Sequence, residues 1–286
     1  MMFLLLWLLT SPASAGQKQQ KDQAGDIYEI SSRYKTSSES GGGSTGSSSG
    51  RTILIERVLE VREDGLKLEY DLPKPEKEKK HGAYWKFPAQ IFRHHVGEPE
   101  LLNGDEMEAR IDSWLESAGW TREVCGRWIF TWNAFLIGCD PQAALRMAES
   151  YNLRQKNIEP GADYKDSHAI ESALLGVKTA SSDGTVYIVE MRIDPEIFLR
   201  EQAASDVILA EITGEPVTLE DALLARSTDR YSGTITITFD TDSSGRIVRK
   251  TRVTRLQIER AGGKLEKSTA TTILERRLIS SAATDQ

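Results

Sequence analysis

One aromatic stretch, residues 114–139, constrains the fold of this chain more than any other segment. It contains four of the six tryptophans of the sequence and both cysteines: Trp114, Trp120, Trp128, Trp132, Cys125 and Cys139. Because indole rings bury a large apolar surface, a chain with such a cluster builds its core there or uses the cluster to line a ligand cavity. The stretch therefore predicts the centre of the protein, and leaves open whether that centre is a cavity or a closed core.

The amino terminus, residues 1–15, is typical of a secretory signal peptide. A short apolar run ends in Ala13-Ser14-Ala15, which fits the small-residue pattern of a cleavage site, although no Lys or Arg precedes the run. The run is shorter than the roughly 20 residues that span a bilayer, and no later stretch is long and apolar enough, so we expect no transmembrane segment. Residues 16–25 are polar and predict a flexible lead-in. The sequence thus favours export, and the absence of any N-x-S/T sequon fits a bacterial periplasm.

Export favours a disulfide between Cys125 and Cys139, because an oxidising compartment pairs cysteines at such a spacing. Closing a loop of this length stabilises a fold by about 3 kcal/mol in the chain-entropy model. A metal site is not expected, since C-x-x-C spacing is absent. Of the four histidines only His94 and His95 are adjacent, and adjacent side chains on a strand point to opposite faces. No cofactor is expected either.

The first third of the chain predicts strands. Residues 27–36 form a first strand, and the Ser/Gly-rich residues 37–50 form a flexible loop. Residues 52–62 and 66–72 alternate around Asp64-Gly65, which predicts a hairpin. On its first arm we expect four apolar residues to face the core and Glu56 to face solvent; the four are Ile53, Ile55, Leu59 and Val61.

Helices are predicted in the middle of the chain from their capping residues. Asn103, with Glu106 as its capping-box partner, begins a helix that carries Trp114. Further helices begin after Asp140-Pro141, Asp194-Pro195 and Thr218. Residues 128–137 are apolar enough for a buried strand or a short helix, and periodicity does not decide between them.

The last third predicts strands again. Residues 185–193 are apolar on both faces and predict a central strand covered on both sides. Residues 234–239, 246–258 and 264–274 form a meander, with a bulge expected between Val253 and Leu256 where the apolar parity shifts.

Together these elements predict an α+β fold. Residues 26–280 would form a single domain, followed by a tail at 281–286, with one curved antiparallel sheet built from the N- and C-terminal strands and covered by the central helices. This layout resembles, in architecture, the half-barrels of periplasmic lipoprotein carriers.

The distribution of charge along the chain limits the classes of molecule that the protein is expected to bind. A net charge of −7 and a pI near 5.3 argue against a nucleic-acid binder. Ten basic residues nevertheless fall between 246 and 277 against three acidic ones, and four of them are candidates for contacting an anionic surface: Arg249, Arg252, Arg255 and Lys267. The alternative is that these long side chains cover the solvent face of the sheet and pair with the acidic helices of the chain.

No catalytic signature is present: the sequence lacks G-x-S-x-G, H-E-x-x-H, a P-loop and a dinucleotide fingerprint. The sequence therefore favours an exported, non-enzymatic binding or carrier-like protein for a lipid or another apolar or anionic ligand of the cell envelope. Four tryptophans are the candidates for lining its cavity: Trp85, Trp114, Trp128 and Trp132. The alternatives are a structural or assembly protein without a small-molecule ligand and, with less support, a hydrolase.

Overall fold

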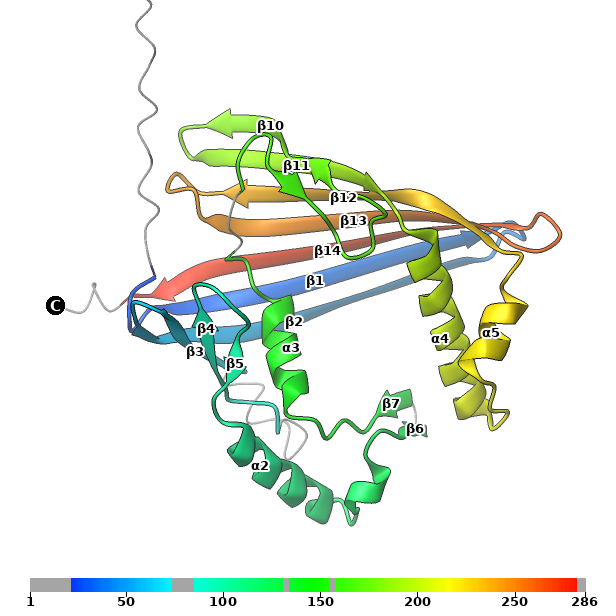
Figure 1. The fold of residues 1–286 in the computed structure, drawn as a ribbon, viewed down its shortest axis with the longest axis horizontal. Coiled ribbons are helices and arrows are strands. Elements are labelled where there is room, and N and C mark those ends of the chain that lie inside the picture. The colour runs from blue at the N-terminus through cyan, green and yellow to red at the C-terminus, as the bar shows by residue number, and fades with distance from the viewer. Residues whose placement is uncertain (1–21, 74–84, 131–133, 155–157, 282–286) are drawn as a thin grey trace, which may run out of the picture.

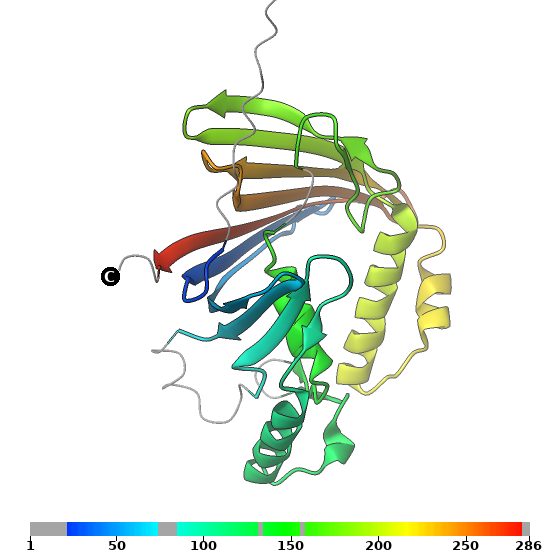
Figure 2. The ribbon, with the colours of Figure 1, turned by 60° about the vertical axis from the view of Figure 1, so that its left-hand side comes forward.

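A computed structural model of the chain describes residues 22–73, 85–130, 134–154 and 158–281. Ten strands form one antiparallel sheet in the order β10-β11-β12-β13-β14-β1-β2-β3-β4-β5. The sheet is curved and the helices lie on its concave side (Figures 1 and 2). Because β5 and β10 are its edges and do not meet, the sheet is open. The expected curved antiparallel sheet with a few helices is confirmed.

The sheet consists of two meanders. The first contains β1 Ile27–Ser40, β2 Thr45–Val61, β3 Gly65–Asp71, β4 Ala89–His94 and β5 Glu100–Leu101. The second contains β10 Gly176–Ser181, β11 Gly184–Arg192, β12 Arg230–Thr241, β13 Ile247–Glu259 and β14 Leu265–Ser280. Strands β1 and β14 join the meanders and pair along the whole length of β1. The two ends of the chain therefore meet in the middle of the sheet.

The helices begin close to the predicted caps. They are α2 Gly104–Ser117, α3 Gln142–Ser150, α4 Pro195–Thr213 and α5 Leu219–Ala225, with a short 3-10 turn η1 at Arg122–Val124. The side chains of Asp194 and Thr218 cap α4 and α5 as expected. Asn103 precedes α2, but its side-chain oxygen accepts from the backbone N–H of Gln90 on β4 rather than from the helix. It ties the helix to the sheet instead of forming the cap.

Four short strands complete the structure as two hairpins outside the main sheet: β6 Trp128–Phe130 with β7 Ala134–Leu136, and β8 Asp163–Tyr164 with β9 Ala173–Leu174. Residues 128–137, for which the sequence leaves strand and helix open, therefore contain two short strands, β6 and β7, that pair with each other. In the part of the chain described here, no helix has the length and apolar character to cross a membrane.

The prediction of a loop at residues 37–50 is wrong. Strand β1 continues to Ser40 and β2 begins at Thr45, so only the turn between them is irregular. Serine and glycine offer little side chain to bury, but pairing of the backbone with β14 and β2 overrides that weak propensity. The ring of Tyr34 lies over Gly50, where an added Cβ would be 2.3 Å from Tyr34 Cε1.

The prediction of which side chains of β2 face the core is also wrong. Leu54, Glu56 and Val58 are the buried residues, with 1 %, 0 % and 1 % exposure. The register with β1 places Leu54 opposite the buried Ile30, which fixes the inward face. A register shift after Val58 leaves the end of the strand exposed. A carboxylate therefore occupies a core position.

Two further expectations for the second meander fail. Strand β11 lies next to the edge strand and alternates, with Val189 and Met191 buried and Glu190 exposed between them. Strand β13 pairs without interruption through the position of the expected bulge, because Thr254, only 5 % exposed, occupies a core position and preserves the alternation.

Candidate functional site: a notch where the sheet divides

The sheet divides between β13 and β14 at one end. Their pairing stops at Arg249 and Glu275. Beyond that point residues 276–280 of β14 continue to pair with β1, whereas Ile247 of β13 pairs with β12. The two strands diverge visibly at the end where the chain terminates (Figure 2). The gap contains a cavity of about 690 Å³, which we call the notch.

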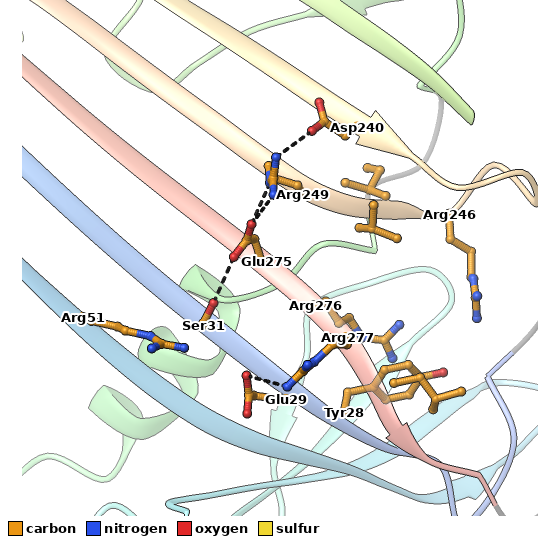
Figure 3. Close-up of a pocket in the computed structure, with 13 residues that line it drawn as sticks. Tyr28, Glu29, Ser31, Arg51, Asp240, Arg246, Arg249, Glu275, Arg276 and Arg277 are labelled. Carbon is orange, nitrogen blue, oxygen red and sulfur yellow. Dashed lines mark hydrogen bonds and ion pairs between the residues drawn. The ribbon is translucent and has the colours of Figure 1, made fainter. Parts of the chain in front are cut away.

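The notch is lined from both faces of the sheet. Successive side chains of a strand alternate between faces, so Arg277 lies on the convex face with Glu29, while Leu278 lies on the concave face with Tyr28. Figure 3 shows Tyr28 and Glu29 of β1 beside Arg276 and Arg277 of β14 at this end of the sheet. The described lining residues are Tyr28, Glu29, Ser31, Arg51, Asp240, Arg246, Ile247, Val248, Arg249, Glu275, Arg276, Arg277 and Leu278. The volume is in the range of small-molecule sites.

Glu275 is the centre of the charges on the convex face. Its carboxylate accepts from Arg33 at 2.7 Å and from Arg249 at 2.5 Å, and Ser31 donates to it at 3.4 Å. Partial burial raises the pKa of Glu275, but its hydrogen bonds to Arg249 and Ser31 and the charges of Arg249 and Arg33 outweigh that effect and lower it. One carboxylate thus serves two guanidinium groups.

Arg51 has no counter-charge among the described residues that line the notch. It lies directly opposite Arg33 in the β1–β2 register, and like charges in that arrangement repel. Its exposed side chain forms no hydrogen bond or ion pair with any residue that the structure describes. By contrast, Arg277 reaches Glu29 at 3.3 Å while remaining 71 % exposed. The opening of the notch on the convex face, which we call the convex mouth, therefore has guanidinium N–H donors that can bind an anion.

Apolar side chains also line the notch, together with the guanidinium groups of Arg246 and Arg276. Ile247 is buried, Val248 is half-buried and Leu278 is 39 % exposed. The guanidinium of Arg276 stacks on the ring of Tyr28, with its Cζ 3.4 Å from the ring centroid. The notch therefore combines a cationic mouth with a cluster of three apolar side chains.

Below the notch, Arg276 belongs to a buried ion network that also contains Glu56, Arg154 and Asp22. Glu56 accepts from Arg154 at 2.7 and 2.5 Å and from Arg276 at 2.8 and 3.1 Å. It also accepts the hydroxyl of Tyr70 at 2.8 Å. Asp22 accepts from Arg154 at 2.7 Å and from Arg276 at 3.0 Å. Two carboxylates and two guanidinium groups balance one another.

This network fixes the charge states within it. Burial raises the pKa of Glu56, but the charges and hydrogen bonds of Arg154 and Arg276 dominate and hold it far below its ordinary value. The pKa of Asp22 is lowered for the same reasons. Because Asp22 is held by these ion pairs, the end of the expected flexible lead-in, residues 22–25, is an ordered part of the structure. The signal peptide predicted at residues 1–15 lies outside the described residues.

The four basic candidates from the sequence do not form one surface. Arg249 lines the notch, and Arg255 and Lys267 are exposed farther along the convex face. Arg252 lies on the concave face, where it forms a two-pronged ion pair with Asp166 at 2.9 Å. The grouping of Arg252 with the others is therefore wrong, because it assigned residues to a region rather than to a face.

None of the three tryptophan candidates that the structure describes, Trp85, Trp114 and Trp128, lines the notch. Trp85 is 5 % exposed and packs in the core. Trp114 is half-buried and meets Trp120 edge to face at 5.9 Å. Trp128 is half-buried in β6, and Trp132 falls outside the described residues. Cys125 and Cys139 form the expected disulfide, with Cα atoms 5.6 Å apart.

Sequence reasoning missed the residues that define this site. Glu56 alternates with apolar residues in a way that also fits a solvent-facing position, and only the register of β1 and β2 reveals its burial. Arg51 directly follows the Ser/Gly-rich segment, residues 37–50, for which the sequence predicts a loop. Recognising that segment as paired strands would have placed Arg51 beside Arg33.

Comparison with protein-family models finds no matching family, and comparison with curated proteins finds no match. Among solved structures, the chain is similar to lipovitellin, in a structure described for its lipid–protein interactions, with a TM-score of 0.35 and 8 % sequence identity. The alignment covers 91 % of this chain and 26 % of the lipovitellin chain, so this chain spans about a quarter of that protein. A likeness this remote carries no functional argument.

Proposed function

We propose that this chain is an exported, non-enzymatic binding or carrier-like protein of the cell envelope that holds an amphipathic ligand in the notch. The observation that carries the proposal is the division of the sheet between β13 and β14, which opens a cavity of about 690 Å³ lined from both faces. Export, most simply to a bacterial periplasm, is supported by the signal-like amino terminus and by the disulfide. No nucleic acid is expected as a partner.

The chemistry of the lining supports binding rather than catalysis. Guanidinium groups donate hydrogen bonds to anions but do not exchange protons near neutral pH, because they remain charged. The carboxylates of the notch are held in ion pairs, as Glu275 is by Arg33 and Arg249. Unpaired backbone at the diverging strand edges adds further donors and acceptors for a polar ligand group.

A structural or assembly protein is the second candidate. It is favoured by the tight packing of Trp85, which behaves as a core residue rather than as the wall of a cavity. In that case the notch would hold water and the protein would act through a surface contact.

A hydrolase has one observation in its favour. Ser167 Oγ lies 2.9 Å from His168 Nδ1, and His168 Nε2 lies 2.8 Å from Glu201, which is the order of contacts in a nucleophile, a base and an orienting carboxylate. Ser167 is exposed, Glu201 is 51 % exposed, and none of the three lines the notch, so no described cavity would hold a substrate against them. Turnover of a panel of generic esters that is lost in Ser167→Ala would revive this candidate.

The test of the proposal is native mass spectrometry of the protein purified from its native compartment, before and after denaturing extraction. We expect an added mass that is released as an amphipathic small molecule. Leu278→Trp should fill the notch and abolish the added mass, whereas Leu224→Trp, at a 72 % exposed position on α5, should retain it. Equal retention in both variants would exclude the notch. A clean protein mass in every preparation would favour the assembly protein.

A further inference from the structure

We infer that the convex mouth of the notch binds the anionic group of its ligand, a phosphate or carboxylate, with Arg51 as the principal donor and Arg33 beside it. The apolar part of the ligand then lies along Leu278 and Ile247. This inference rests on the proposed function, since it assigns the ligand class of the same site.

The balance of charge at the mouth is the first argument. Among the described residues there, four guanidinium groups face three carboxylates: Arg33, Arg51, Arg249 and Arg277 against Glu29, Asp240 and Glu275. Each carboxylate is engaged: Glu29 by Arg277, Asp240 by Arg249, and Glu275 by Arg249 and Arg33. The surplus positive charge falls on Arg51.

The placement of Arg51 is the second argument. The β1–β2 register sets it directly across from Arg33, and the only described counter-charge of Arg33, Glu275, is shared with Arg249. Arg33 and Arg51 therefore repel each other, because their two positive charges face one carboxylate that Arg249 also uses. An anion bound between the two arginines would remove that repulsion. In Figure 3 the side chain of Arg51 extends over the sheet toward Ser31 and Glu29, at the edge of the notch.

The shape of the donor and the apolar side chains of the lining define the ligand. A guanidinium presents a planar fork that matches the paired oxygens of a carboxylate or phosphate. The lining also presents the apolar side chains of Ile247, Val248 and Leu278, and these three add nothing to the binding of a small hydrophilic anion. An amphiphile with a single anionic end, such as an alkyl phosphate or a fatty acid, uses both parts of the notch.

Titration calorimetry with three probes below their aggregation concentrations tests this inference: dodecyl phosphate, dodecanol and inorganic phosphate. We expect dodecyl phosphate to bind more tightly than either of the others. In Arg51→Gln its affinity should fall roughly tenfold, the usual effect of losing a hydrogen bond to a charged group. Arg51→Lys should recover part of the affinity, because it restores the charge without the fork.

Arg255→Gln is the matched control, since Arg255 is an exposed arginine on the same face, away from the notch, with no partner among the described residues. Equal affinities in Arg51→Gln and Arg255→Gln, or dodecanol binding as tightly as dodecyl phosphate, would overturn the inference while leaving the proposed function intact. Inorganic phosphate matching dodecyl phosphate would support the anion site and contradict an amphipathic ligand. Absence of binding by all three probes would count against both.

Discussion

Replacing Glu56 by glutamine should destabilise this protein more than any other single conservative change on the sheet. The side chain is 0 % exposed and accepts hydrogen bonds from Arg154, Arg276 and Tyr70. Glutamine keeps the shape but removes the negative charge, so that two buried guanidinium groups share only the carboxylate of Asp22. Its amide NH2 would also face groups that are themselves donors.

The magnitude follows from the burial of these charges. Removing one partner of a buried ion pair costs about 3–5 kcal/mol, since the remaining charge stays desolvated. Glu56 serves two such charges through bonds of 2.5 to 3.1 Å, which favours the upper half of that range. For a chain of this size the melting temperature should fall by roughly 10–20 °C.

Urea unfolding followed by circular dichroism would measure this change, with Glu60→Gln as the control. Glu60 lies on the same strand but is exposed, so its replacement should change the free energy of unfolding by less than about 0.5 kcal/mol. The double variant Glu56→Met, Arg154→Met leaves Arg276 paired with Asp22, and we expect it to be more stable than Glu56→Gln. A loss below about 1 kcal/mol in Glu56→Gln would refute the claim that the network is buried and fully paired.

The same network predicts a pH dependence. Because the folded pKa of Glu56 lies below its ordinary value of 4.5, its stabilisation is present above that pH and is lost as the pH falls toward the folded pKa. The stability advantage of the native chain over Glu56→Gln should therefore shrink below about pH 4.5. A constant difference between pH 7 and pH 3 would contradict this assignment.

Three further changes test other parts of the structure. Cys125→Ser should lower the free energy of unfolding by about 2–3 kcal/mol in denaturant melts, and reduction of the native chain should match it. Gly233→Ala should cost about 2–4 kcal/mol, because an added Cβ would lie 2.0 Å from the backbone oxygen of the opposite strand, whereas Gly138→Ala meets nothing within 4 Å and should be near neutral. Trp85→Ala should cost about 3–5 kcal/mol and Trp114→Ala about 1–2 kcal/mol, in proportion to their burial; the reverse order would mean that Trp114, not Trp85, anchors the core.

Local signals in the sequence predicted local structure well. The turn at Asp64-Gly65 and the caps at Asp194 and Thr218 lie where expected, because each depends on neighbours a few residues away. The C-terminal meander was also recovered from alternation and turn residues. The conformation of these elements is determined by residues that lie close together in the sequence.

Features that depend on distant partners were not predictable. Whether Glu56 or Ile55 faces the core depends on pairing with β1. Within residues 37–50, the end of β1 at residues 37–40 pairs with the distant strand β14. The notch arises where two paired strands part, and the composition of β13 and β14 carries no mark of that point. The charge imbalance at Arg51 exists only once strands far apart in sequence lie side by side.

The pairing of the first strand with the last has a consequence for how the chain folds. Strands β1 to β5 can assemble hairpin by hairpin as they are synthesised, but one edge of β1 stays open until β14 has been made, and contacts such as Ser31 with Glu275 span 244 residues. An open strand edge can pair with other chains and aggregate. Residues 31–40 present mostly serine, threonine and charged side chains along that edge, with few apolar groups to stabilise a wrong partner. The serine-rich composition of these strands therefore limits wrong pairing at the open edge of β1 until β14 has been made.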